Sequence, residues 1–542
     1  MLPSPSSSPA HVLEHITNVP PRKPLRQAPL KFFPTPPNEK KPKRQAQLLA
    51  SDSPRKRIKL SQEFVASDSD EYGSSSDEYL EEDSEDEDVF FAGPSARPAQ
   101  PTHRANHRVT SMYNKPASFP MSSFSQLSTR PILQSFVSSS KADVFKCESV
   151  QPDRYLTPPY ACSYSHGAKK GQKSYLAVAN EEGTVHIFDT SKRRDWDPEP
   201  QRSTLQPHQN GVFEVKWDET DSRIATCSGD KSARITDVRT GTITHALQGH
   251  SNTIKCVTWD PNHQELLATG SRDGTICLWD LRTSERHGDS ELHLAQPVRM
   301  IHGAHQEPQL KGKGRARKGI SAPPGITSLL YPDALTYGLV SSGSADGILK
   351  YWDLRCLEST KKSRGAKPKP PPVLLSSPMD PTTLQGSRRA RGILSLAAGS
   401  GPTAGLIFGL GADSNIHCYS LPSLEPQTSR QYSHPNLKAS SFYVTLSVST
   451  CGRWLASGGT STDGRAFLFD VEASRSSGNS PGSTAVQLSS QRGEIGAVDW
   501  AQDALATCAD DGTVRIWRPD VEVYRGCVEM PEEKRWDWAW GS

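Results

Sequence analysis

The decapeptide Ser271-Arg272-Asp273-Gly274-Thr275-Ile276-Cys277-Leu278-Trp279-Asp280 decides the fold, because near copies of it recur along the chain. Residues 344–353 repeat it most closely, and residues 509–517 and 228–237 follow the same pattern. Each copy begins with a tight turn and continues as a short apolar run that usually ends in Trp or Trp-Asp. Such runs, bounded by turn residues, predict β-strands joined by hairpins and therefore an all-β domain.

Three diverged copies, at residues 182–189, 413–419 and 463–470, bring the number of repeats to seven. The repeats end at Asp189, Asp237, Asp280, Asp353, Ser420, Asp470 and Arg518, at intervals of 48, 43, 73, 67, 50 and 48 residues. Without their obvious insertions, the two long intervals approach the roughly 40 to 45 residues of a WD40 blade. A four-stranded blade buries both faces only by stacking against two neighbours, so seven blades are expected to close a ring.

The predicted architecture is a seven-bladed WD40 β-propeller over residues 151–525, followed by a C-terminal extension over residues 526–542. Residues 1–150 are rich in Pro, Ser and charge and lack an apolar period, which predicts a disordered tail. The whole chain is only 34% hydrophobic, below the roughly 45% of globular proteins, as expected if part of it forms no packed core.

Composition and termini exclude several classes of protein. No apolar run approaches the roughly 18 residues of a membrane span, and a net charge of +3 is too small for a histone-like binder. The ten cysteines are scattered, with no C-x-x-C pair, so neither a zinc site nor a disulfide framework is expected. The N-terminus lacks the pattern of a secretory signal, which indicates the cytosol or the nucleus.

No catalytic or metal-binding constellation is recognisable. A Walker loop, a dinucleotide fingerprint and an H-E-x-x-H helix are missing from the sequence. Residues 478–482 fit G-x-S-x-G formally, but no helix follows and Pro481 lacks the N–H that an oxyanion hole needs. His302 and His305 have no carboxylate or thiol cluster nearby, and His305 falls at the usual His position of a blade. We therefore expect no enzyme activity, no metal, no cofactor and no small-molecule substrate.

Polar residues inside the repeats resemble the hydrogen-bond network of WD repeats, in which His, Ser or Thr, Asp and Trp link neighbouring strands. The third blade matches it with His250, Thr269, Asp273 and Trp279. The second matches it with His208, Thr226 and Asp230, while Thr236 replaces Trp. Because buried polar groups must be paired, these residues are expected to serve the scaffold rather than catalysis.

Two basic clusters in the tail have the spacing of a bipartite nuclear import signal, which predicts an import receptor as partner and a nuclear location. They are formed by Lys40, Lys41, Lys43 and Arg44 and, after ten residues, by Arg55, Lys56, Arg57 and Lys59. A solvated basic stretch and a nucleic-acid contact are the alternatives. Phosphorylation of Ser53, which precedes Pro54, would add negative charge among these cations and is expected to tune import.

Two further tail segments suggest contacts of different kinds. Between residues 68 and 88, 12 of 21 residues are acidic, which favours an extended, solubilising spacer over a docking site. Gln27, Leu30, Phe32 and Phe33 resemble the peptide by which proteins bind the sliding clamp PCNA. Only Lys31 separates Leu30 from the aromatic pair, where the usual motif has two residues, so an incidental apolar cluster is the competing interpretation.

Two repeats end in the same tetrapeptide, at residues 279–282 and 352–355. A blade needs the Trp for packing but does not need the Arg, which suggests a docking surface at the rim. This W-D-x-R ending resembles the box by which WD-repeat substrate receptors bind the β-propeller adaptor of cullin-4 RING ubiquitin ligases. The resemblance implies adaptor contacts at Trp279, Asp280, Arg282, Trp352, Asp353 and Arg355. Arg239 repeats the pattern in part.

A wider resemblance covers the whole propeller. Residues 176–183, 343–355, 413–416 and 441–444 look like the denticleless family, whose members deliver replication-licensing factors on DNA-loaded PCNA for ubiquitination. The resemblance implies a non-catalytic, nuclear substrate receptor that acts in the cell cycle, DNA replication and protein degradation. Animal members carry a long C-terminal extension with a clamp-docking peptide, whereas this chain stops soon after its seventh blade, as in a fungal-like member. That leaves residues 27–33 as the clamp-docking candidate.

The substrate is expected at the mouth of the central channel, where propellers usually bind ligands, near Phe213, Thr253, Phe442 and Tyr443. Basic insertions at residues 311–318, 361–369 and 388–391 fall between blades 3 and 5. They suggest salt-sensitive contacts with an acidic partner or with DNA beside the clamp, or simply solubilising loops. The alternative function is a WD-repeat scaffold for chromatin or replication assemblies without a ubiquitin role.

Overall fold

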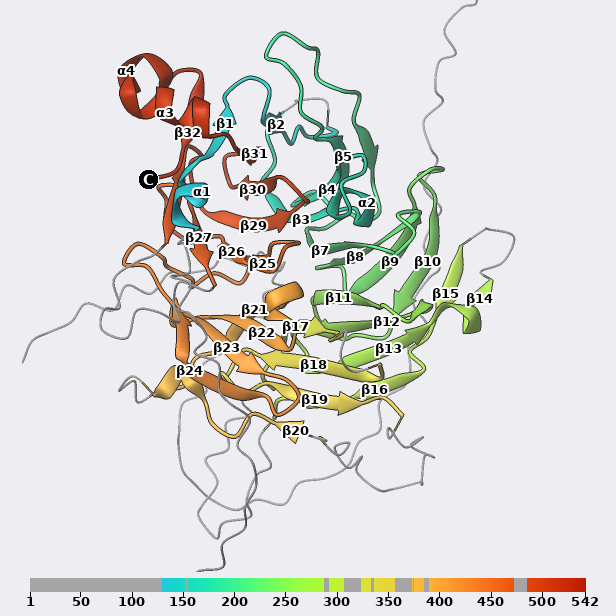
Figure 1. Ribbon diagram of the computed structural model, residues 1–542. Coiled ribbons are helices and arrows are strands. Elements are labelled where there is room, and N and C mark those ends of the chain that lie inside the picture. The colour runs from blue at the N-terminus through green and yellow to red at the C-terminus, as the bar shows by residue number, and fades with distance from the viewer. Residues whose placement is uncertain are drawn as a thin grey trace, which may run out of the picture. The chain divides into compact units, whose positions relative to one another are not determined.

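A computed structural model describes residues 129–542, apart from 152–154, 287–291, 307–322, 333–335, 356–372, 374, 385–388 and 472–484. These residues belong to the compact unit of residues 114–542. As predicted from the repeats, they form a seven-bladed β-propeller (Figure 1). No helix in these described ranges is long and apolar enough to cross a membrane.

Blades 1 to 3 are antiparallel sheets whose first strand lines the central channel. Blade 1 contains β3 (Pro159–Tyr164), β4 (Tyr175–Asn180), β5 (Val185–Asp189) and β6 (Ser203–Leu205). Blade 2 contains β7 (Val212–Trp217), β8 (Arg223–Ser228), β9 (Ser232–Asp237) and β10 (Ile243–Gln248). Blade 3 contains β11 (Ile254–Asp260), β12 (His263–Ser271), β13 (Ile276–Asp280) and β16 (Arg299–Ile301).

Blades 4 to 6 repeat this order. Blade 4 contains β17 (Ile326–Leu330), β18 (Gly338–Gly343), β19 (Lys350–Asp353) and β20 (Leu375–Ser376). Blade 5 contains β21 (Ile393–Ala398), β22 (Leu406–Gly411), β23 (Ile416–Ser420) and β24 (Glu425–Tyr432). Blade 6 contains β25 (Leu446–Val448), β26 (Trp454–Ser457), β27 (Arg465–Asp470) and β28 (Val486–Ser489).

In most blades the tight turn of the repeat places one residue in the left-handed region, although Gly347 of blade 4 does not adopt it. Gly274 adopts φ +75° there, and a Cβ on it would lie 2.9 Å from the carbonyl oxygen of Pro324. The diverged blades 2 and 5 place Lys231 (φ 66°) and Ser414 (φ 63°) at the corresponding position. Because side chains other than that of Gly disfavour this conformation, the Asp-Gly copies are the ones most easily recognised in the sequence.

The ring is closed by contacts between inner strands. β3, β7, β11, β17, β21, β25 and β29 (Ile495–Trp500) touch in this order, and β29 then touches β3. At several junctions a side chain of one inner strand accepts a backbone N–H of the next. Glu214 Oε2 accepts from Val257 at 2.8 Å, and Asp499 Oδ2 accepts from Tyr164 at 2.8 Å. At these junctions the blades are fixed to each other by hydrogen bonds as well as by apolar packing.

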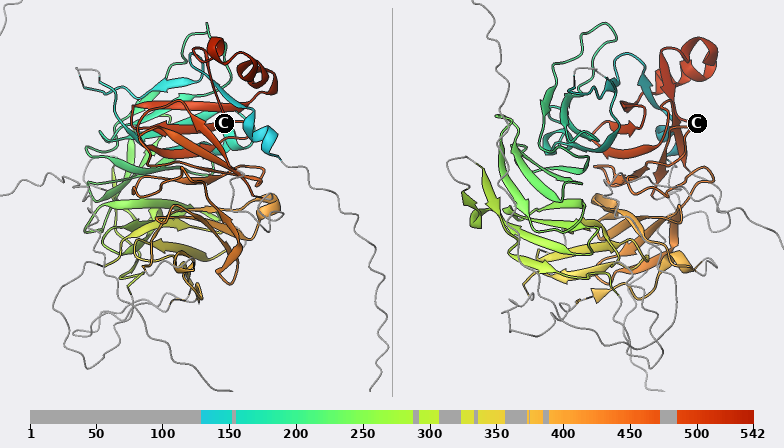
Figure 2. Two further views of the ribbon diagram at one scale, coloured as in Figure 1. Left: turned by 90° about the vertical axis from the view of Figure 1, so that its left-hand side faces the viewer. Right: turned by 180° about the vertical axis from the view of Figure 1, so that it is seen from behind.

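Both ends of the described chain meet in blade 7, which also contains β30 (Leu505–Ala509) and β31 (Thr513–Pro519). β1 (Phe136–Ser139) and β2 (Val144–Lys146) pair with β31, and β32 (Trp538–Trp540) pairs with β1. Figure 2 shows the cyan β1 beside the red strands of blade 7. Ser542 also exchanges two backbone hydrogen bonds with Gln487 of blade 6, at 2.9 and 3.0 Å.

These pairings shift the predicted domain boundaries. The boundary at residue 150 falls inside the propeller, because residues 129–149 supply the outer strands of blade 7 rather than part of a tail. The predicted extension over residues 526–542 likewise includes a strand of that blade. In the described ranges, four short helices accompany the strands: α1 (Arg130–Gln134), α2 (His166–Lys169), α3 (Val521–Glu529) and α4 (Pro531–Lys534). Three 3₁₀ turns are η1 (Leu281–Thr283), η2 (Pro381–Thr383) and η3 (Gly401–Thr403).

An insertion in blade 3, between β13 and β16, pairs with the outer strand of blade 2 and so links the two blades. It forms β14 (Glu285–Arg286) and β15 (His293–Ala295), and β15 pairs in parallel with β10. The rings of His245 and His293 stack across this pairing with centroids 5.1 Å apart. The insertion therefore extends the sheet of blade 2 to six strands.

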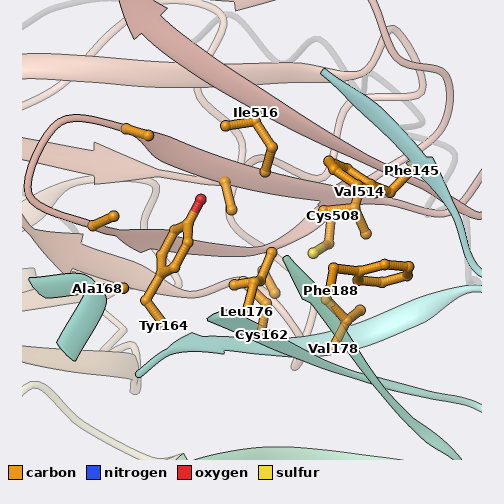
Figure 3. Packing of buried hydrophobic residues seen from close by; sticks show 14 of the residues in the cluster. Phe145, Cys162, Tyr164, Ala168, Leu176, Val178, Phe188, Cys508, Val514 and Ile516 are labelled. Atoms are coloured by element: carbon orange, nitrogen blue, oxygen red, sulfur yellow. The ribbon is translucent and has the colours of Figure 1, made fainter. Parts of the chain in front are cut away.

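The apolar core lies between neighbouring blades. Figure 3 shows one such cluster, in which Tyr164 and Phe188 of blade 1 face Val514 and Ile516 of blade 7, with Phe145 of β2 beside them. Cys162 and Cys508 lie in the same cluster. Of the nine described cysteines, eight are buried free thiols that pack as small apolar residues, and burial raises the pKa of Cys147 to about 12.

The predicted WD network is present in blade 3. Thr269 Oγ1 lies 2.7 Å from His250 Nε2 and accepts from Trp279 Nε1 at 2.8 Å. In blade 4, Ser341 Oγ lies 2.9 Å from His305 Nε2 and accepts from Trp352 Nε1 at 2.9 Å. These His and Trp residues are buried, so the network links the strands and is not available for catalysis.

We expect Thr269→Val to destabilise the propeller more than Thr226→Val. The first change leaves both His250 and Trp279 without their partner, at about 1 to 3 kcal/mol for each buried group. The second removes one such contact, because Thr226 Oγ1 lies 2.9 Å from His208 Nε2 while Thr236 stands where blade 3 has Trp279. Urea denaturation of the two variants measures the difference, and equal losses would contradict this assignment.

Candidate functional site

Arg282 and Arg355 occupy equivalent positions beyond the third strands of blades 3 and 4. Arg282 Nε and Nη2 donate to Asp280 at 2.8 and 2.7 Å, and Arg355 Nε and Nη2 donate to Asp353 at 3.0 and 2.8 Å. Both side chains stay exposed, at 69% and 65%. A guanidinium held in a bidentate pair at the surface is pre-oriented for a partner, because less side-chain entropy remains to be lost on binding.

The neighbouring residues of each tetrapeptide have a supporting role. Trp279 and Trp352 are 1% exposed, so they pack inside the blades beneath the two arginine turns and present no surface to a partner. Asp280 accepts the backbone N–H of Arg282 at 3.1 Å, and Asp353 accepts that of Arg355 at 2.9 Å. The predicted rim therefore consists of two exposed arginines on a buried aromatic and acidic support.

Arg239, the partial third copy, is exposed but lies in a different setting. Asp237 accepts the backbone N–H of Thr240 at 2.8 Å. Thr236, which replaces Trp, has a buried hydroxyl without a hydrogen-bond partner among the described residues. The Arg239 turn thus lacks the Trp support that the other two arginines share.

The side chains of Phe213, Phe442 and Tyr443 contact one another on the face of the propeller opposite to the two arginine turns. The ring of Phe213 lies 5.8 Å from that of Phe442 and 5.7 Å from that of Tyr443. Phe213 is the second residue of the inner strand of blade 2, whereas the other two precede the inner strand of blade 6. Because these blades are not neighbours, the segment before β25 must reach across the channel mouth.

The structure adds three residues to this cluster that sequence reasoning missed. Tyr160 stacks on Tyr443 at 4.5 Å, and the cations of Lys255 and Arg272 lie 4.8 and 5.7 Å from the Phe442 centroid. Tyr160, Phe213 and Lys255 are each the second residue of an inner strand, so aligning the repeats by that strand would have identified them. The predicted Thr253 takes part through its carbonyl, which accepts the backbone N–H of Arg272 at 3.0 Å.

Charges of opposite sign flank the aromatic cluster. Lys255 and Arg272 lie on the blade 3 side. On the other side, burial raises the pKa of Glu494 and of Asp510. Burial, followed by the charge of Glu181, raises the pKa of Tyr160 well above its usual value and keeps the phenol neutral. The aromatic cluster at the channel mouth therefore has one basic and one acidic side.

Strand register places the two sites on opposite faces. In blade 3, Ile254 pairs with Ser271 beside the Asp273 turn, whereas Leu266 pairs with Asp280 at the other end of the sheet. Arg282 follows Asp280, and the aromatic residues lie at the end where the inner strands begin. The two candidate sites therefore lie at opposite ends of the blades.

The remaining predicted sites lie mainly outside the described residues. They comprise the clamp-docking candidate, the import signal, the acidic segment, the G-x-S-x-G match and the insertions at 311–318 and 361–369. Of the basic residues at 388–391, Arg389 and Arg391 are described and exposed, near the start of β21. Within the described ranges, no three His, Cys, Asp or Glu side chains are grouped so that they could hold a metal ion.

Comparison with known proteins places this geometry in a family context. The family described as WD domain, G-beta repeat matches residues 199–237, 241–280 and 483–518. The Danio rerio denticleless protein homolog is 32% identical over 403 residues, which is 71% of this chain and 56% of that protein. The Homo sapiens denticleless protein homolog is 29% identical over 69% of this chain and 48% of that protein.

A fungal relative shows a similar level of identity. The Schizosaccharomyces pombe cell division cycle protein cdt2 is 30% identical over 357 residues, which is 64% of this chain and 66% of that protein. The match thus spans about half the length of the vertebrate relatives and a larger share of the yeast protein.

Proposed function

Because the chain is a denticleless-type WD-repeat protein, we propose that it is the substrate-recognition subunit of a nuclear cullin-4 RING E3 ubiquitin ligase. It directs replication-licensing or cell-cycle proteins, including PCNA-associated ones, to degradation. The subunit is non-catalytic in this proposal, and partner subunits transfer ubiquitin.

The observation that supports this proposal is the pair of exposed arginines on neighbouring blades. Arg282 and Arg355 share one face and one geometry, each with a guanidinium clamped by the aspartate two residues earlier. Arginines in bidentate pairs give directional contacts, which suits recognition of a folded adaptor protein. Arg239 at the neighbouring blade 2 is a peripheral member of this surface.

The aromatic channel mouth is the proposed substrate surface. Tyr160, Phe213, Phe442 and Tyr443 offer rings for apolar contacts, and the flanking charges can orient a peptide laid across them. A receptor must hold adaptor and substrate together, and opposite faces of one ring satisfy that requirement without competition.

The proposal assigns the tail two further roles. Residues 40–59 direct the protein to the nucleus through an import receptor, and Gln27, Leu30, Phe32 and Phe33 contact PCNA. Both segments lie outside the described residues, so these roles rest on the sequence pattern. A tail peptide over residues 23–38 that shows no heat of binding to PCNA would remove the second role.

Two binding measurements separate this function from the alternative scaffold. The purified full chain is titrated against the purified cullin-4 adaptor propeller and, separately, against a fluorescent DNA duplex at increasing salt. The proposal predicts saturable adaptor binding that tolerates salt. Steeply salt-dependent DNA binding without adaptor binding would favour the scaffold, with the basic insertions as its contacts.

A further inference from the structure

Tyr337 lies beside the Arg355 turn and was not identified from the sequence. It is 43% exposed, and the Arg355 guanidinium lies 5.1 Å from its ring centroid. The ring centroid of His263, the first residue of β12 in the neighbouring blade 3, lies 6.1 Å from that of Tyr337. The Tyr337 carbonyl accepts the backbone N–H of Leu354 at 3.0 Å, which ties its position to the Arg355 turn.

The corresponding residue in blade 3 is an acidic side chain instead of an aromatic one. Gly338 pairs with Asp353 and Leu266 pairs with Asp280, so Glu265 stands where blade 4 has Tyr337. Glu265 already pairs with Arg223 of blade 2 at 3.2 Å. The Asp280 hydrogen bond, and to a lesser degree the charge of Glu265, raise the pKa of Arg282. Arg282 is therefore held among carboxylates, whereas Arg355 is held between a carboxylate and an aromatic ring.

We propose that Tyr337 and Arg355 form one hot spot for the cullin-4 adaptor, and that Arg282 contributes less to its affinity. This inference rests on the proposed function and names the dominant part of that surface. Tyr and Arg are the residues most often found at interface hot spots, and a stacked pair presents a rigid surface. Arg282 must share its charge with two local carboxylates before it meets a partner, which lowers its attraction for an acidic one.

The test is a double-mutant cycle on the full chain, read out as the dissociation constant for the purified adaptor. Tyr337→Ala and Arg355→Ala are each expected to weaken binding roughly 10- to 30-fold, the range of an interface hot spot. The double variant should weaken it by much less than the product of the two effects. Arg282→Ala should cost less than about 5-fold, and Tyr337→Phe should bind like the unmodified chain.

Tyr175→Ala is the matched control, because Tyr175 in blade 1 also carries a cation over its ring, Lys173 at 4.8 Å, and is 36% exposed. It should bind the adaptor normally, and all variants should keep the unmodified melting temperature within a few degrees. Additive losses, or a larger loss for Arg282→Ala, would overturn the hot spot and leave the proposed function standing. An unmodified chain that does not bind the adaptor would overturn both.

Discussion

Deleting residues 1–146 is expected to abolish the cooperative unfolding of the propeller, whereas deleting residues 1–128 should preserve it. The longer deletion removes β1 and β2 and leaves the outer edge of β31 unpaired. It also removes Leu133, Phe136, Val137 and Phe145, all at most 3% exposed. At about 1.5 to 3 kcal/mol for each buried side chain, the loss is about 6 to 12 kcal/mol, comparable with the whole stability of a typical domain.

Differential scanning calorimetry of the two deletion variants makes this comparison directly. The chain from residue 129 retains every described element and serves as the matched control. A single-site variant, Phe136→Ala, should lower the stability by about 3 to 5 kcal/mol without preventing folding. If the chain from residue 147 melts within a few degrees of the control, the N-terminal strands do not close the ring.

The combined change Arg282→Glu and Arg355→Glu is expected to weaken adaptor binding by more than about 100-fold. Each reversal removes a guanidinium and places a new carboxylate beside Asp280 or Asp353, so both turns become strongly acidic. The side chains are 69% and 65% exposed, so the fold should be little affected. Surface plasmon resonance with the immobilised adaptor gives the affinities, and thermal melts report folding.

Arg389→Glu with Arg391→Glu is the matched control for this double reversal. It changes the net charge by the same amount at exposed positions near the start of β21, on the face of the aromatic cluster. The control should bind the adaptor normally. Equal losses in both double variants would mean that overall charge, and not the arginine turns, governs binding.

The blades could be predicted from the sequence because their signals are local. The Asp-Gly turn and the following apolar strand lie within ten residues, and each blade repeats them. The closure of blade 7 carries no such signal, because Val137 pairs with Arg518, far along the chain, in a segment without apolar period. The same reason explains why the β14–β15 clamp was missed, since it joins an insertion of one blade to the outer strand of another.

The candidate sites also contain residues that the sequence identifies and residues that only the structure reveals. Arg282 and Arg355 belong to a contiguous tetrapeptide, so the sequence was enough to select them. Glu265 of β12 and Tyr337, which directly precedes β18, are far from these tetrapeptides in the sequence and were found only through strand pairing. Tyr160 joins Tyr443 across the channel for a similar reason, because it touches a blade that is not its neighbour. The residues that surround each candidate site are therefore set by pairing between strands and contacts between blades, which a motif within one repeat does not reveal.

Hydrogen–deuterium exchange of the full chain, with and without the adaptor propeller, tests the central claim most directly. The account predicts slower exchange at residues 260–266, 279–283, 337–338 and 352–355, with no change at residues 159–161, 212–214 and 442–444. Protection of the aromatic residues instead, or no protection on either face, would contradict it.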